Sequence, residues 1–147
     1  MASQPTSVLF VCTHNAIRSP MAEAFLKHAH GHRIYVDSAG VREGELDPFA
    51  VAVMAETDLD IARHRPKTLA DLEDDSFDLV ITLSPEAHHK ALEMTRTSAF
   101  EVEYWPVMDP TFVEGNRETR LAAFREARDE IRRRIEARFP SQQPAAV

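Results

Sequence analysis

The stretch VLFVCTHNAIRSPMAEAF, residues 8–25, decides the fold class of this chain. A continuous apolar run leads into Cys12, the only cysteine of the sequence. Such unbroken apolar runs are typical of strands that are covered on both faces of a parallel sheet. Ser19 and Pro20 then resemble an N-cap and the first position of a helix. The stretch therefore predicts a strand, a loop and a helix in succession, with the thiol at the end of the strand.

The rest of the sequence continues this alternation of strands and helices. Strands are predicted at residues 8–12, 34–36, 79–83 and, more weakly, 102–105. Helices are predicted at residues 20–30, 48–57, 85–95 and about 117–139, with Asp47 and Ser84 as further N-caps. Strands that alternate with helices indicate a doubly wound α/β domain. We find no internal repeat, low-complexity tract or linker between domains.

Length and composition fit one globular domain. The chain has 147 residues, so we expect a domain over 1–139 and a disordered C-terminal tail over 140–147. No apolar run approaches the roughly 18 residues of a membrane span, and the N-terminus does not look like a secretion signal. A single cysteine suits a reducing cytoplasm. The net charge of −7 argues against nucleic-acid binding, and no membrane partner is expected.

The loop between the first strand and the first helix predicts an oxyanion site. In parallel sheets, ligands bind beyond the carboxyl ends of the strands, which is where Cys12 lies. The following helix N-terminus favours negative charge, and Arg18 adds a forked cation that matches two oxygens of a tetrahedral anion. Ser19 can donate its hydroxyl to the Cys12 sulfur, and His14 and Asn15 tolerate the left-handed backbone of tight loops. A buried structural cysteine is the alternative interpretation, which the neighbouring Arg18 makes less attractive.

Asp109 is the best candidate for a catalytic acid. A nucleophile that takes a phosphoryl group needs an acid to protonate the leaving oxygen. Asp109 lies in YWPVMDPTF, after the fourth predicted strand, where a loop should return to the same edge of the sheet. An Asp-Pro pair also opens turns, and a rigid turn can aim a carboxylate. The histidines His28, His30 and His32 fit an exposed helix end better than a metal site, so no metal is predicted.

The sequence resembles the low-molecular-weight protein tyrosine phosphatase family. VLFVCTHNAIRSPMAEA, then VDSAG at residues 36–40, then Asp109-Pro110 before a long final helix occur in family order over roughly residues 7–139. The resemblance implies a four-stranded parallel sheet flanked by helices on both faces. It also implies hydrolysis of a phosphomonoester, first of all protein phosphotyrosine, through a phosphocysteine and without a cofactor. A phosphorylated protein or small phosphomonoester would be the substrate, and phosphate or a related oxyanion a ligand.

The resemblance also implies roles for individual residues. Cys12 would be the nucleophile, Arg18 the phosphate clamp, and Asp109 the acid and then the base. Phe112 would stand on the wall of the substrate pocket. The phosphate-binding and supporting residues would be Thr13, His14, Asn15, Ala16, Ile17, Ser19, Ser38 and His64.

Some positions depart from the phosphatase pattern. His14 stands where these phosphatases usually carry glycine, and Ile17 where a second cysteine is often found. The aromatic pair that often follows Asp-Pro is Thr111-Phe112 here. The stretch 41–47, which should form the opposite pocket wall, contains no aromatic residue.

A second function is therefore considered beside the first. CTHNAIRS, LDPFAVAVMAETDLDIARHRPKTL and AFREARDEIRRRI also look like arsenate reductases of the same fold. Members that carry their own resolving cysteines have them after the third strand, where this chain reads TLSPEAHHKALEMT. A reductase made from this chain would borrow thiols from glutathione with glutaredoxin, or from mycothiol. We rank the phosphatase first, and a non-catalytic phosphate-binding module last.

Overall fold

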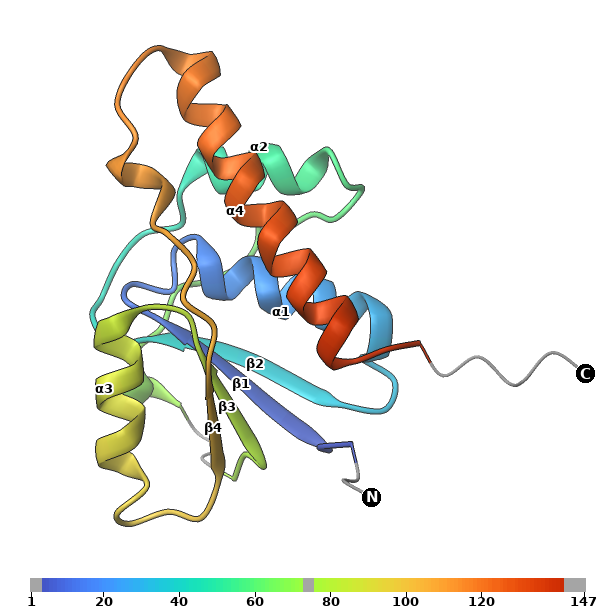
Figure 1. Ribbon diagram of the computed structural model, residues 1–147, viewed down its shortest axis with the longest axis vertical. Helices are drawn as coiled ribbons and strands as arrows, with labels where there is room; N and C mark the ends of the chain where they lie inside the picture. Colours follow the sequence, from blue (N-terminus) through green and yellow to red (C-terminus); the bar gives the residue numbers. More distant parts are fainter. Residues whose placement is uncertain (1–3, 73–75, 142–147) are drawn as a thin grey trace, which may run out of the picture.

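The computed structural model describes residues 4–72 and 76–141. Four parallel strands form one sheet in the order β2-β1-β3-β4 (Figure 1). The strands are β1 (Ser7–Cys12), β2 (Tyr35–Gly40), β3 (Leu79–Thr82) and β4 (Glu101–Tyr104). The helices are α1 (Arg18–His30), α2 (Pro48–Ala55), α3 (Pro85–Met94) and α4 (Arg117–Arg138), with short 3-10 turns at Leu69–Asp71 and Pro110–Phe112. The predicted α/β class and its four-stranded parallel sheet are confirmed.

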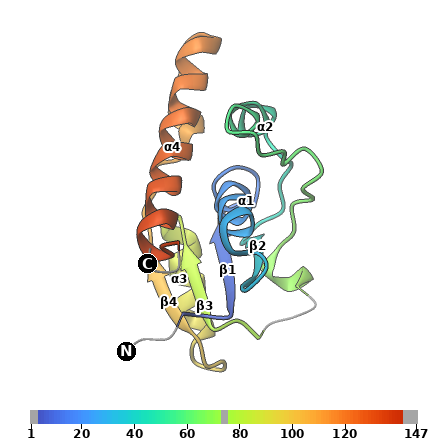
Figure 2. The ribbon, with the colours of Figure 1, turned by 90° about the vertical axis from the view of Figure 1, so that its right-hand side faces the viewer.

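The sheet is covered on both faces, as predicted. In β1, Val8 and Phe10 pack into a core shared with α1, α2 and α4. Leu9 and Val11 point the other way, into a smaller core that includes Ala87 of α3. Figure 2 shows the helices arranged about the sheet from a second direction. Burial on both faces explains why the β1 sequence is continuously apolar rather than alternating.

Pairing between strands sets bounds that local sequence did not predict. β2 extends to Gly40 rather than ending at residue 36, because each of its residues pairs with one of β1, from Ser7 with Tyr35 to Cys12 with Gly40. β3 and β4 end one residue earlier than predicted. The polar residues of β2 thus belong to the sheet, and they carry its carboxyl end to the level of Cys12.

Two of the three predicted N-caps are confirmed. Asp47 accepts from the backbone N–H of Phe49, and Ser84 caps α3 in the same way. The prediction that Ser19 caps α1 is wrong. The helix begins two residues earlier than predicted, at Arg18, without a side-chain cap. Ser19 lies inside the first turn, where its hydroxyl contacts Cys12 instead.

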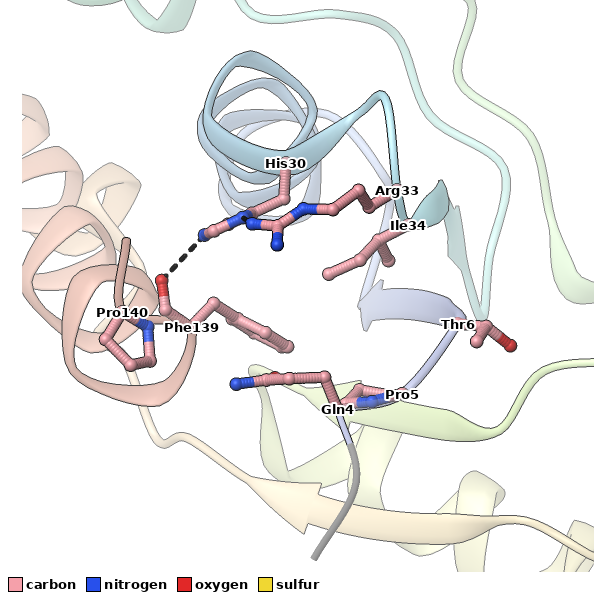
Figure 3. Close-up of a pocket in the computed structure, with 8 residues that line it drawn as sticks. All are labelled: Gln4, Pro5, Thr6, His30, Arg33, Ile34, Phe139 and Pro140. Carbon is pink, nitrogen blue, oxygen red and sulfur yellow. Dashed lines mark hydrogen bonds between the residues drawn. The ribbon is translucent and has the colours of Figure 1, made fainter. Parts of the chain in front are cut away.

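His30 is buried, which corrects the expectation of an exposed helix end. Its Nδ1 lies 2.9 Å from a guanidinium nitrogen of Arg33, which can only donate, so Nε2 carries the proton and donates to the carbonyl oxygen of Phe139 at 2.8 Å (Figure 3). The histidine ties the end of α1 to the end of α4, beside a cavity of about 110 Å³. Most of the predicted tail, residues 142–147, lies outside the described residues, so its disorder stays a prediction.

Candidate active site

The loop from Cys12 to Arg18 wraps around the cysteine sulfur. Asn15 takes the left-handed conformation, with φ of 57°, and its N–H lies 3.2 Å from Cys12 Sγ. The predicted left-handed turn is therefore present at Asn15. His14 does not share it, because Asn15 and Asp58 are the only described non-glycine residues with positive φ. The left-handed residue turns the backbone so that an N–H points at the sulfur.

A hydroxyl group also points at the sulfur. Ser19 Oγ lies 2.8 Å from Cys12 Sγ and 2.8 Å from Nδ2 of Asn15. Because the side-chain nitrogen Nδ2 of Asn15 can only donate, Ser19 Oγ accepts there and has its own proton left for the sulfur. A hydroxyl donor of this kind stabilises a thiolate. Cys12 is itself buried at the floor of the loop.

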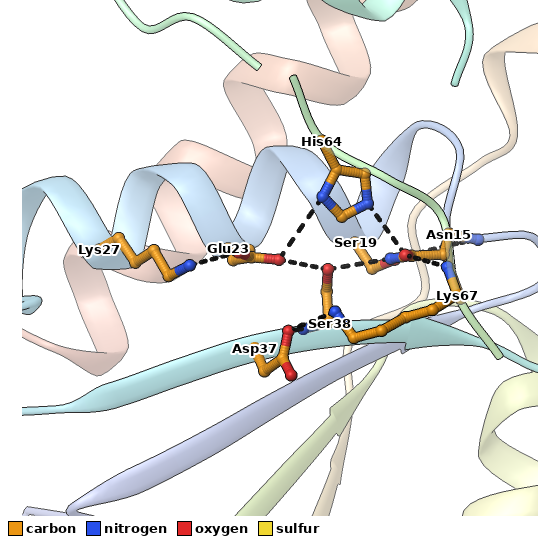
Figure 4. A network of polar contacts seen from close by, with 9 residues as sticks. Asn15, Ser19, Glu23, Lys27, Asp37, Ser38, His64 and Lys67 are labelled. Atoms are coloured by element: carbon orange, nitrogen blue, oxygen red, sulfur yellow. Dashed lines mark hydrogen bonds and ion pairs between the residues drawn. The ribbon is translucent and has the colours of Figure 1, made fainter. Parts of the chain in front are cut away.

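Both side-chain polar atoms of Asn15, Nδ2 and Oδ1, form hydrogen bonds (Figure 4). Its Nδ2 donates to Ser19 and, at 2.9 Å, to Ser38 of β2. Its Oδ1 accepts from Nε2 of His64 at 2.9 Å and from the backbone N–H of Lys67 at 3.1 Å. The donors and acceptors of this buried amide are thus occupied, which fixes the loop conformation that it carries.

A carboxylate underlies this network. Ser38 Oγ donates to Glu23 Oε1, while Lys27 donates to Oε2 of Glu23 at 2.6 Å. The other ring nitrogen of His64 lies 3.9 Å from Glu23 Oε1. Burial lowers the pKa of His64, and the nearby positive charge of Lys67 lowers it further, against the attraction of Glu23. The Oδ1 of Asn15 can only accept, so Nε2 of His64 carries a proton and donates it there.

Arg18 is buried and aimed by backbone carbonyls at the carboxyl edge of the sheet. Its Nη1 donates to the carbonyl oxygen of Val107 at 2.8 Å and more weakly to that of Leu83 at 3.4 Å. Its Nη2 lies 3.8 Å from Oδ2 of Asp109. The guanidinium is thus anchored by one nitrogen and directed toward the mouth of the loop by the other.

Asp109 is aimed by the turn that it opens. Its Oδ1 accepts from the backbone N–H of Thr111 at 2.9 Å and from Oγ1 of Thr111 at 2.7 Å. The other oxygen, Oδ2, faces Arg18. Both sequence interpretations of Asp-Pro therefore hold, since the residue caps the 3-10 turn Pro110–Phe112 and directs a carboxylate at the loop.

The remaining loop residues have mainly backbone or packing contacts. Thr13 Oγ1 donates to Ser84 Oγ at 3.1 Å, which joins the loop to the start of α3. The carbonyl oxygen of Ala16 accepts from the N–H of Asp47 at 3.2 Å. Ile17 is buried in the larger core, where it precedes α1.

A cleft of about 620 Å³ opens beside Arg18 and Asp109. Phe112 lines it and is 78% exposed, and its role on the wall of a substrate pocket stays a prediction. The sequence analysis missed Tyr104 and Met108 as further lining residues. The complete lining consists of Thr13, His14, Arg18, Leu83, Ser84, Pro85, Glu86, Tyr104, Pro106, Val107, Met108, Asp109 and Phe112.

The expected opposite wall is not where the sequence predicted it. None of the lining residues comes from the stretch 41–47. That stretch lies instead over the loop from Cys12 to Arg18, called the anion loop below for its predicted role. The N–H of Arg42 donates to the carbonyl oxygen of Thr13, and a Cβ added at Gly44 would meet Cβ of His14 at 2.7 Å. Residues at and just after the carboxyl ends of β3 and β4 line the cleft instead, because these two neighbouring strands end at the same edge of the sheet.

The family model for the low molecular weight phosphotyrosine protein phosphatases matches residues 7–143. The chain belongs to this family. Within it, the chain is 37% identical to an arsenate reductase of Bacillus licheniformis, over 88% of this chain and 91% of the relative. It is 32% identical to a glutaredoxin arsenate reductase of Synechocystis sp., over 88% and 92%. A solved structure described as an arsenate reductase in the phosphate binding state superposes with a TM-score of 0.73 at 30% identity, covering 89% of this chain and 94% of that one.

Among the residues that the structure describes, no group of three or more His, Cys, Asp or Glu side chains could hold a metal ion. In the same part of the chain, no helix has both the length and the apolar character to cross a membrane. The loop, the clamp and the carboxylate that the phosphatase-family resemblance singled out are brought together at one edge of the sheet.

Proposed function

We propose that this chain is an arsenate reductase that takes its electrons from external thiols. The observation that carries the proposal is that relatives at 32–37% identity, covering 88% of the chain, are named arsenate reductases. The sequence contains Cys12 and no other cysteine, so the further thiols that the reaction needs come from elsewhere.

The loop suits arsenate because arsenate is a tetrahedral oxyanion like phosphate. The N–H groups at the start of α1 and the guanidinium of Arg18 would bind its oxygens. The Cys12 thiolate would attack arsenic, and one arsenic oxygen would leave as water with a proton from Asp109. This step forms a covalent bond between Cys12 Sγ and As(V).

Reduction requires two thiols from outside the chain. The first would attack Cys12 Sγ, and the sulfur–arsenic bond would break with its electron pair left on arsenic, which becomes As(III). Cys12 would then be held in a mixed disulfide, which the second thiol would release by exchange. In sum, arsenate and two thiols give arsenite, one disulfide and water. Glutathione with glutaredoxin, or mycothiol, can supply the thiols in a reducing compartment such as the cytoplasm.

This order of the two candidate functions differs from the order that the sequence alone suggested, in which hydrolysis of phosphomonoesters came first. The comparisons favour the second interpretation. Hydrolysis remains a second candidate because of one specific observation: Asp109 Oδ2 lies 3.8 Å from Arg18, where a carboxylate can protonate an ester oxygen and later deprotonate water. Tyr104, Met108 and Phe112 would then contact the organic group of the ester.

One paired assay tests the proposal. Arsenite formation is measured with glutathione and glutaredoxin, with mycothiol, with thioredoxin and without thiol, beside hydrolysis of para-nitrophenyl phosphate. Thiol-dependent arsenite formation that disappears in Cys12→Ser is expected. Ester hydrolysis with no arsenite formed in any thiol system would overturn the proposal and promote the second candidate.

A further inference from the structure

The cleft beside the anion loop is larger than an inorganic oxyanion needs. Its volume of about 620 Å³ lies within the roughly 300–1,000 Å³ that is typical for sites of small organic ligands. Tyr104, Met108 and Phe112 give it an apolar side, while Arg18 and Asp109 lie at its inner end. In an arsenate reductase, the organic reactant that must reach Cys12 is the thiol. A thiol that entered the cleft would lie beside Thr13, His14 and Arg18, which belong to the loop and helix start that follow Cys12.

An approaching thiol must lose its proton, because the thiolate is the attacking form. Ordinary thiols are largely protonated near pH 7. The two carboxylates that line the cleft are already engaged. Asp109 accepts from Thr111 and faces Arg18, and both oxygens of Glu86 are held by the guanidinium of Arg42 at 2.6–3.1 Å.

His14 is the histidine among the lining residues, and its side chain makes no hydrogen bond to any other described residue. It directly precedes Asn15, whose N–H lies 3.2 Å from Cys12 Sγ, so it stands on the wall of the anion pocket. Gly40 packs closely on the backbone of His14, and Gly44 packs on its side chain: an added Cβ would lie 2.7 Å from the His14 carbonyl carbon at Gly40 and 3.3 Å from His14 Cγ at Gly44. His14 as a whole is exposed and belongs to the lining of the cleft.

We propose that His14 takes the proton from the external thiol as that thiol attacks Cys12, an inference that rests on the proposed reductase function. The S–H bond of the thiol breaks, its proton passes to a ring nitrogen of His14, and its sulfur forms a disulfide bond with Cys12 Sγ. The bond between Cys12 Sγ and arsenic breaks at the same time, and arsenic keeps the electron pair. The thiol is oxidised and arsenic is reduced. Imidazole is suited to this role since it exchanges a proton near neutral pH.

The charges around His14 are mixed. Glu86 of α3 faces it: the hydrogen bond from Arg42 chiefly lowers the pKa of Glu86, and positive charge on His14 contributes to the same shift. The converse also holds, so the Glu86 carboxylate stabilises the imidazolium that forms. Arg18 and Arg42 oppose it, and the loop over His14 carries Glu43 and Glu45 on either side of Gly44. The ring of His14 thus lies among both carboxylates and guanidinium groups.

Thiol exchange on a preformed mixed disulfide tests this role without arsenate. Cys12 is converted to its thionitrobenzoate disulfide with dithiobis(nitrobenzoate), and release of the coloured thiolate is followed as an added thiol attacks. The thiols are mercaptoethanol, which is mostly protonated near neutral pH, and the more acidic trifluoroethanethiol. His14→Gln keeps a polar side chain but cannot take a proton in this range. His89→Gln is the control, because His89 is exposed on α3 and does not line the cleft.

A base role predicts a specific pattern. Near pH 7, His14→Gln should slow attack by mercaptoethanol by about 10²-fold, the lower end for general base catalysis. The loss should be much smaller for trifluoroethanethiol and should disappear at a pH where both thiols are ionised, while His89→Gln behaves as wild type. Equal losses for both thiols at every pH would mean a steric role, and no loss would mean no role. Either result overturns the proposal.

Steady-state arsenate turnover with the same two thiols is the second measurement. The same dependence on thiol acidity is expected there. If arsenate is not reduced by any variant, the reductase function fails, whereas the exchange experiment still decides the role of His14.

Discussion

Arg18 and Asp109 face each other at the carboxyl edge of the sheet, with Nη2 of the arginine 3.8 Å from Oδ2 of the carboxylate. The same guanidinium is anchored through Nη1 to the carbonyl oxygen of Val107, two residues before Asp109 in the chain. One segment therefore both orients the cation and supplies the carboxylate. A tetrahedral anion bound by the fork of Arg18 would lie within reach of a proton from Asp109.

Replacement of Arg18 by lysine should separate charge from geometry. Arg18→Lys keeps the positive charge but loses the planar fork that grips two oxygens. We expect kcat/KM for arsenate, or for a phosphate ester, to fall by about 10²–10³-fold, as when one oxyanion donor is removed. Arg42→Lys is the matched control and should have a small effect, because Arg42 binds Glu86 and does not line the cleft. Turnover close to wild type in Arg18→Lys would mean that the clamp does not act through two hydrogen bonds.

Cys12 should react as a thiolate that is held within an anion site. Asn15 N–H and Ser19 Oγ both point at its sulfur, at 3.2 and 2.8 Å. Iodoacetate should therefore alkylate it faster than free cysteine near neutral pH, and phosphate or arsenate should protect it. Ser19→Ala should slow alkylation several-fold because one donor to the sulfur is lost. Alkylation at the rate of free cysteine, unaffected by either anion, would contradict the assignment of Cys12 as nucleophile.

The left-handed backbone of Asn15 and its side-chain bonds make separable contributions to stability. Asn15→Ala leaves buried partners of the amide without a hydrogen bond, which costs about 1–3 kcal/mol, and also strains the left-handed backbone by roughly 1 kcal/mol. Asn15→Gly loses the same bonds without the strain. Urea unfolding should therefore rank the free energies of unfolding as wild type, then glycine, then alanine. Alanine and glycine variants of equal stability would show that φ at this position carries no cost.

A surface cluster at the end of α2 gives a dependence on pH. Hydrogen bonds from Arg125, and then from Arg128, lower the pKa of Glu56 to about 2 from a usual 4.5. A lowered pKa in the folded state means that the contribution to stability is complete above about pH 4.5 and is lost as the pH falls toward 2. Glu56→Gln should therefore lower the melting temperature by a few degrees near pH 7, and wild type and variant should converge in acid.

The control for this cluster is Glu136→Gln, since Glu136 forms an ion pair with Arg132 and is more exposed than Glu56. Its effect should be smaller at every pH. Melting curves of Glu56→Gln that stay parallel to those of wild type down to pH 2 would contradict the assigned pKa.

Local sequence predicted the part of the site that depends on consecutive residues. The apolar run into Cys12, the arginine at the helix start and the polar loop between them suffice for a strand, an anion loop and a helix. Ser19 shows where such local rules fail. Its position suits an N-cap, but the close approach of Cys12 Sγ gives its hydroxyl a different partner.

Contacts between distant elements could not be predicted in this way. Glu23 joins the network under the loop because α1 crosses β2 at the level of Ser38, and nothing in the sequence around Glu23 signals this. Tyr104 was not identified from the sequence as a residue of the cleft. It stacks on His88 of α3, with ring centroids 4.5 Å apart, and lines the cleft as well. The register of β4 beside β3 decides that position, and register is a property of the assembled sheet.

Asp109 distinguishes the two candidate reactions. For an ester with a poor leaving group, the departing oxygen is strongly basic unless it is protonated, and general acid catalysis of this kind is typically worth about 10²–10⁴-fold. Asp109→Asn should therefore depress hydrolysis strongly for alkyl phosphates and much less for activated aryl phosphates. Thr111→Val removes the hydroxyl that holds Oδ1 of Asp109 at 2.7 Å but keeps the carboxylate, so its defect should be intermediate.

The dependence of turnover on thiol concentration completes this test. In a hydrolase, the carboxylate must also deprotonate water in the second half-reaction, so phosphocysteine should accumulate in Asp109→Asn. In a reductase, an incoming thiol resolves the intermediate, and turnover should saturate with that thiol in wild type. Asp109→Asn should then slow formation of the sulfur–arsenic bond, because the leaving oxygen lacks its proton. The thiol concentration that gives half-maximal turnover should not rise in this variant. Thiol-saturable arsenate turnover in wild type, with feeble hydrolysis of even activated esters, is the outcome that we expect. A steep dependence on the leaving group together with trapped phosphocysteine and no arsenite would identify the hydrolase instead.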